Sequence, residues 1–159
     1  MIYYYYVDIE KSNIGILSII DSSNNIHTFI IQQDNKIQKL NSILKSLLKN
    51  KPAIIITYNK KQDIIEYFIK YKIHIYRKEY KAAVDNVICI DLMSLLNMHE
   101  SNKKYNIKNL SSYALKHNIY IKENYKTIDE AVETCKRAAE TIKMLADENN
   151  DAIALAILR

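Results

Sequence analysis

Three β-prone segments follow one another at the start of the chain, and they constrain its fold more than any other feature. Residues 2–9, 14–20 and 26–31 are rich in isoleucine and tyrosine, side chains that favour strands. The polar sequence Asp-Ser-Ser-Asn-Asn at 21–25 suits a tight turn between the second and third segments. The pattern predicts a three-stranded antiparallel meander whose first strand is buried on both faces.

Strand and helix patterns alternate after this meander. Short apolar runs predict two further strands, at residues 53–57 and 87–90. Apolar spacing predicts helices over residues 37–48, 64–69, 91–98, 107–117 and 128–146. The order predicts an α/β fold, in which a mixed five-stranded sheet continues from the antiparallel meander into parallel strands and has helices on both faces.

The chain has the size of one domain, with 159 residues of which 48% are hydrophobic. We expect a domain over residues 1–150, with 151–159 as a C-terminal helical extension or a truncated linker. No signal peptide and no membrane span is recognisable, so we expect a soluble, intracellular (cytoplasmic) protein without a membrane partner.

Charge and cysteine content narrow the function only slightly. The net charge of +5 is compatible with nucleic-acid binding, although many basic proteins bind none. Cys89 and Cys135 lack the spacing of a zinc site, and we expect both to be reduced, packed thiols. The four histidines show no ligand spacing either.

Two carboxylates near the end of the first predicted strand are the first candidates for chemistry. Asp8 and Glu10 are two residues apart, so the period of a strand places them on the same face. Converging carboxylates repel each other and lose hydration unless a cation such as Mg²⁺ or hydrogen-bond donors compensate. A solvated strand end is the alternative interpretation of this common pattern.

The fourth predicted strand ends in a second polar segment. Here Thr57-Tyr58-Asn59 opens a turn, and Asp63 follows four residues after Asn59. This segment and Val7-Asp8-Ile9-Glu10 resemble the first two motifs of the DEDD (DnaQ-like) 3′-to-5′ exonuclease superfamily, which has a ribonuclease-H-like fold. Further similar stretches occur in order at 90–92 and 105–110, so the resemblance spans residues 1 to about 148.

The third motif departs from that family. The resemblance aligns Thr134 with the fourth metal-binding aspartate, and Asp129 with the general-base histidine. Glu130 aligns with the tyrosine of another subgroup and lies one helical turn before Thr134. Glu130 or Asp129 could replace the missing ligand, but acids at a helix start also stabilise the helix dipole without any part in catalysis.

The resemblance implies a site with two metal ions, Mg²⁺ or Mn²⁺, that hydrolyses phosphodiesters at single-stranded DNA or RNA 3′ ends. Asp8 would bridge both ions, Glu10 would bind the water-activating ion, and Asp63 would bind the other. Loss of the fourth carboxylate weakens one ion site. A polymerase or another replication or repair protein is an expected partner.

Nucleic-acid contacts are predicted around the second and third motifs. The candidate residues are Tyr58, Asn59, Lys60 and Thr134. Lysine is abundant throughout, so a solvated surface is the alternative interpretation of Lys60. For Tyr58 the alternative is a half-buried tyrosine in a turn. Tyr3, Tyr4, Tyr5 and Tyr6 are predicted to pack in the core.

Two hypotheses follow from these patterns. The first is a metal-dependent 3′-to-5′ exonuclease, slowed by the absence of the fourth aspartate and of the general-base histidine. The second is a catalytically inactive relative that serves as a nucleic-acid-binding or protein-interaction module.

Overall fold

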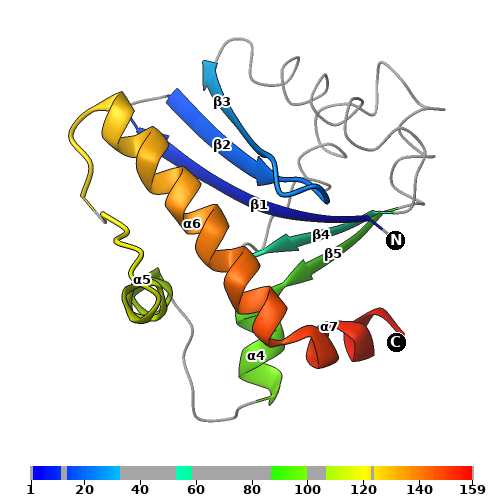
Figure 1. Cartoon of the computed structure of the whole chain (residues 1–159). Coiled ribbons are helices and arrows are strands. Elements are labelled where there is room, and N and C mark those ends of the chain that lie inside the picture. Colours follow the sequence, from blue (N-terminus) through cyan, green and yellow to red (C-terminus); the bar gives the residue numbers. More distant parts are fainter. Residues whose placement is uncertain are drawn as a thin grey trace, which may run out of the picture.

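The structure is a computed structural model that describes residues 2–11, 14–32, 53–58, 87–99, 107–122 and 124–158. Five strands form one mixed sheet in the order β3-β2-β1-β4-β5 (Figure 1). The strands are β1 (Ile2–Lys11), β2 (Ile14–Ile20), β3 (Ile26–Gln32), β4 (Ala53–Thr57) and β5 (Val87–Asp91). The predicted mixed five-stranded sheet is confirmed.

The first three strands form the predicted antiparallel meander. Asp21 organises the turn between β2 and β3, because its Oδ1 atom accepts hydrogen bonds from the amides of Ser23 and Asn25 at 2.9 Å each. Asn24 adopts a φ of 65°, in the left-handed region that asparagine tolerates better than most residues. The turn therefore forms where its side chains predict it.

The parallel half of the sheet ends earlier than β1 does. β4 pairs with β1 from Ile2↔Ala53 to Tyr5↔Ile56, and β5 then pairs in parallel with β4. Beyond Tyr5, the remaining residues of β1 are paired with β2. The C-terminal half of β1 thus extends past its last pair with β4.

Four helices lie within the described residues: α4 (Leu92–His99), α5 (Ile107–Lys116), α6 (Ile128–Glu148) and α7 (Asn150–Ile157). The first three agree with the predictions at 91–98, 107–117 and 128–146. The long helix α6 crosses β1 and β2, with α5 beside it (Figure 1). The helices predicted at 37–48 and 64–69 lie outside the described residues. No described helix is both long and apolar enough to cross a membrane.

α6 packs on the sheet through small side chains. Ala131, Cys135, Ala138 and Ala139 are buried along this helix at spacings of three and four residues. Small residues let a helix axis approach a sheet closely. The Cys135 thiol lies 3.5 Å from the Val7 carbonyl oxygen, to which it donates, and 3.5 Å from the Ile16 carbonyl oxygen.

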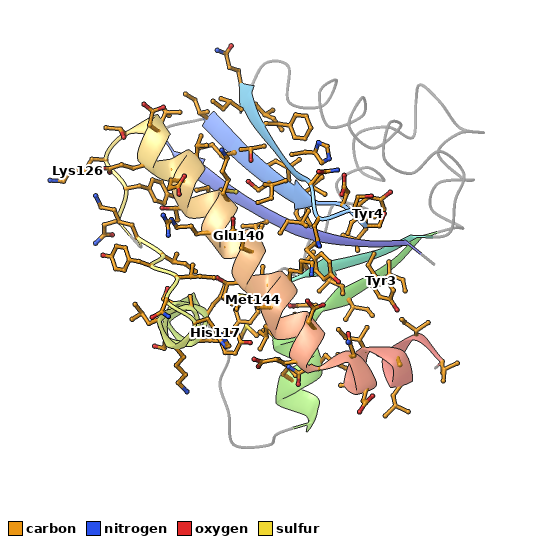
Figure 2. All side chains as sticks on the ribbon, viewed as in Figure 1. Tyr3, Tyr4, His117, Lys126, Glu140 and Met144 are labelled. Atoms are coloured by element: carbon orange, nitrogen blue, oxygen red, sulfur yellow. The ribbon has the colours of Figure 1, made fainter. Side chains whose placement is uncertain are left out.

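The two faces of the sheet are both buried. Tyr5, Ile54 and Ile56 belong to the main core with side chains of all four described helices. Leu17 and Ile19 alternate with the residues of that face and are buried as well. Tyr3 and Tyr4 project from opposite sides of β1 (Figure 2). Burial of Tyr4, Tyr5 and Tyr6 confirms their predicted place in the core.

The last residues pack onto the same core. Ile153 of α7 is buried with residues of α4 and α6. Leu155 and Leu158 of the same segment are exposed. The segment that follows residue 150 is therefore helical, and one of its side chains joins the core.

Candidate metal and nucleic-acid site

Asp8 and Glu10 lie in the C-terminal half of β1. Their Cα partners across the antiparallel ladder are Leu17 and Gly15 of β2. Both residues come after the last pair between β1 and β4, at the end of the central strand of the sheet. The backbone thus places the Asp-x-Glu pair where the sequence predicts it, whereas their side chains lie outside what the structure describes.

The packing of α6 divides β1 into two sets of positions. Val7 and Ile9 contact the small cluster that contains Ala131 and Cys135 of α6. Residues of a strand alternate between its faces, so positions 8 and 10 belong to the face opposite α6. Tyr4 and Tyr6 have the same parity.

The residues after β4 are described only as far as Tyr58. Tyr58 is 8% exposed and belongs to the main core. A ring so buried offers little area to a nucleotide, and its contact with nucleic acid stays a prediction. Asn59, Lys60 and Asp63 lie outside the described residues.

Thr134 is a buried residue whose hydroxyl group is engaged. Its Oγ1 atom donates to the carbonyl oxygen of Lys122, at 3.1 Å. This contact joins α6 to the segment that precedes it. The side chain therefore has a structural contact at the position where the family resemblance expects an aspartate.

Glu130 is held by the start of α6 and by the segment before it. Its carboxylate accepts from the Lys126 amide at 2.7 Å and from Lys122 Nζ at 3.0 Å. The Lys126 amide and then the Lys122 ammonium hold the pKa of Glu130 below its ordinary value. The carboxylate therefore stays ionised, with two donors that a competing metal ion would displace.

Asp129 and Glu133, the two acids next to Glu130 in this stretch, also serve the local structure of the helix. Asp129 is exposed in the first turn of α6, where a carboxylate complements the helix dipole. Glu133 accepts from Arg137 Nε at 2.9 Å, one turn further along the helix. Lys126 projects away from the domain ahead of α6 (Figure 2).

A capping motif explains Glu130, and its signal is present in the sequence. Thr127 and Glu130 have the Thr-x-x-Glu spacing of a capping box. Thr127 is the N-cap of α6, and its Oγ1 atom accepts from the Glu130 amide at 3.1 Å. The Glu130 carboxylate reaches the amide one residue before the cap, so the motif is a variant of the usual box. The spacing predicts this capping role, and a metal-binding role of Glu130 stays a prediction.

Among the side chains that the structure describes, no three His, Cys, Asp or Glu residues come together as a metal site. Asp8, Glu10 and Asp63 are not among those side chains. No protein-family model matches the sequence, and no curated protein shows significant similarity to it. The function is therefore inferred from the residues and the fold.

Proposed function

We propose that this chain is a ribonuclease-H-like domain that acts as a metal-dependent 3′-to-5′ exonuclease on single-stranded DNA or RNA. The observation that supports the proposal is the sheet: an antiparallel meander followed by two parallel strands, with Asp8 and Glu10 at the end of its central strand. The resemblance of the first two sequence motifs to DEDD exonucleases implies this arrangement.

The donor set suits a hard divalent cation. Asp8 and Glu10 lie two apart on one strand, and Asp63 follows β4, the neighbour of β1 in the sheet. Carboxylate oxygens are the ligands that Mg²⁺ and Mn²⁺ prefer, and the metal, when bound, activates water and stabilises the leaving oxygen. Two like charges on one strand repel each other, so a bound cation would stabilise this half of β1.

The contacts of α6 favour a weak enzyme. Thr134 is bonded to Lys122, and Glu130 is held by Lys122 and Lys126. Neither side chain replaces a fourth ligand without losing these contacts. In this proposal the ligands come from β1 and from the segment after β4.

The test is a cleavage assay with a 5′-labelled single strand in Mg²⁺ or Mn²⁺. Trimming from the 3′ end by single nucleotides is expected, and Asp8→Asn is expected to lower the rate by a factor of at least about 10². Asp151→Asn, which removes an exposed acid of α7, serves as the matched control. Equal rates for Asp8→Asn and wild type would remove the proposal.

Thr134→Asp tests whether α6 takes part in the site. The family pattern predicts strong activation by this substitution, because it restores the fourth carboxylate. The bond from Thr134 to Lys122, together with the opposite parity of positions 8 and 10, predicts no activation. Strong activation would assign the α6 face of β1 to the metal site.

A second candidate function is a nucleic-acid-binding module without catalysis. The engaged side chains of Thr134 and Glu130 are the observations that favour it, since both of these α6 positions serve local structure. This function predicts binding of a single strand without release of nucleotides, unchanged by Asp8→Asn. The same cleavage assay, paired with a binding measurement, separates the two functions.

A further inference from the structure

An open groove of about 530 Å³ lies between α5 and the segment that precedes α6. Ser111, Ser112 and Leu115 line it from α5. Tyr120, Lys122 and Asn124 line it from the following segment. None of these six residues belongs to the motifs of the proposed nuclease site.

Two of the lining residues expose large apolar surfaces. Tyr120 is 63% exposed and Leu115 is 58% exposed, although Ile121 beside Tyr120 is buried in the core. An exposed tyrosine ring in a groove is a surface on which a nucleobase can stack. Hydroxyl and amide groups surround this ring, so the surface is mixed rather than apolar.

Lys122 is the charged residue among those that line the groove, in a stretch of sequence that is rich in lysine. Residues 107–127 contain Lys108, Lys116, Lys122 and Lys126, and Glu123 is the one acid in this stretch of sequence. The Lys122 ammonium lies 3.0 Å from Glu130 Oε1, and its side chain is 45% exposed. An ammonium group has three donors, so this ion pair orients Lys122 and leaves donors for a phosphate oxygen.

One lining residue, Ser111, has a buried polar atom without a hydrogen-bond partner among the described residues. Ser111 Oγ is buried and forms no hydrogen bond with any of the residues described. Buried polar groups normally have a partner, since an unsatisfied group costs free energy. Because the Ser111 Oγ atom is buried, its partner would be a water held beneath the groove.

The segment that lines the groove also contacts β1, on the face that α6 covers. The Thr134 hydroxyl of α6 donates a hydrogen bond to the Lys122 carbonyl oxygen. Tyr125, three residues further on, packs on the cluster formed by Ile16, Ala131 and Cys135, which Val7 and Ile9 of β1 also contact. Lys122 lines the groove and Tyr125 contacts the C-terminal half of β1, on the face opposite positions 8 and 10.

We propose that this groove binds single-stranded nucleic acid, with one unstacked base against Tyr120 and an adjacent phosphate at Lys122. The inference rests on the proposed function, because single-stranded nucleic acid is the substrate proposed there. Positive charge and an aromatic platform are the two features that bind single strands without sequence preference.

Binding of a fluorescent oligothymidylate of about 12 nucleotides to the full chain tests the groove, measured by anisotropy in EDTA so that no metal contributes. Tyr120→Ala is expected to raise the dissociation constant about tenfold, since base stacking on an aromatic ring is lost. Tyr120→Phe keeps the ring and is expected to bind within about twofold of wild type. Leu155→Ala, on α7 and 53% exposed, is the control for loss of an exposed apolar side chain and is expected to bind as wild type.

Lys122→Gln gives a separate readout. It is expected to reduce the slope of log Kd against log salt by about 0.7, the value for one phosphate contact on a single strand. Circular dichroism of each variant checks that the fold is retained. An unchanged slope would remove Lys122 from the binding surface.

Several outcomes would overturn the proposal: no binding by wild type at about 100 µM protein, equal binding of a duplex, or wild-type affinity in Tyr120→Ala. A concentration-dependent dimer that Tyr120→Ala dissociates would assign the groove to a second copy of the chain instead. Failure of the nuclease function is distinguishable, because it appears as absence of cleavage in Mg²⁺ or Mn²⁺ while the Tyr120 effect on binding persists.

Discussion

The two halves of β1 have different surroundings. Residues 2–5 are paired on one side with the parallel strand β4, and Tyr5 is buried in the main core. Residues 6–11 are paired with β2 and extend past the last β1–β4 pair. One face of this second half lies against the small side chains of α6.

This difference suggests that the two halves of β1 contribute differently to stability and to metal binding. A carboxylate in the first half would lose its hydration among tyrosines and isoleucines, without a cation to compensate. Beyond the end of β4 the strand carries Asp8 and Glu10 instead. The first half is therefore expected to determine stability, and the second half to determine metal binding.

The largest effect is expected in the first half. Tyr5→Ala removes a buried ring from the main core and is expected to lower the free energy of unfolding by about 3–5 kcal/mol, measured by urea denaturation. Tyr120→Ala, which removes an exposed ring, is expected to change it by less than about 0.5 kcal/mol. Similar losses in both variants would contradict the contribution of buried Tyr5 to the core.

The second half is tested by metal-dependent stability. Wild type is expected to gain up to about 2.7 kcal/mol when Mn²⁺ is present at about a hundred times its dissociation constant. Asp8→Asn is expected to lose this gain and to unfold no earlier than wild type in EDTA, since it removes one of two like charges. Scanning calorimetry with and without Mn²⁺ measures both quantities, and a full gain in Asp8→Asn would exclude Asp8 as a ligand.

The start of α6 lies against the second half of β1 and sharpens the comparison further. Thr127→Ala removes the N-cap hydroxyl and is expected to cost about 1 kcal/mol of stability, whereas Thr127→Ser retains it. Denaturant unfolding measures the loss. Equal stability of both variants would show that the cap contributes nothing.

The smallest effect is expected at the hairpin next to the first half, where β2 ends beside Tyr5. Burial on its own would raise the pKa of Asp21, but hydrogen bonds from His27 and from the turn amides hold it below its ordinary value. A lowered folded-state pKa contributes stability above about pH 3.9, the unfolded value, and this contribution is lost as pH falls through the folded pKa.

Asp21→Asn tests this contribution. The wild type is expected to exceed the variant in stability at neutral pH, and the difference is expected to shrink as the medium is acidified below about pH 3.9. Thermal unfolding monitored from pH 7 to pH 2 measures the trend. A stability difference that grows on acidification would contradict a lowered pKa of Asp21 in the folded state.

Much of the fold could be predicted from residue patterns. Alternating and continuous apolar runs identify all five strands, and helical spacing identifies α4, α5 and α6, because burial of apolar side chains sets both periods. Asp21 and Asn24 are turn residues by their own chemistry, which made the hairpin predictable. The antiparallel meander followed from its short connections, and the parallel direction of the later strands from the crossovers, whereas the order of the strands in the sheet was not predicted.

The candidate site was less predictable because its residues depend on contacts from distant segments. Glu130 is an acid one turn before Thr134, and spacing alone does not reveal that Lys122 and Lys126 bind it. Positions 8 and 10 are adjacent on one face by sequence, but which face α6 covers follows only from the packing of Val7 and Ile9. The groove at Tyr120 has no sequence motif.

The thiol of Cys135 has a practical consequence. The thiol is buried between α6 and the carbonyl oxygens of Val7 and Ile16. A reagent therefore reaches it only when the helix separates from the sheet. With Cys89 replaced by serine, the rate of alkylation would report how often this detachment occurs. A single sulfur atom therefore reports how often α6 separates from the C-terminal half of β1.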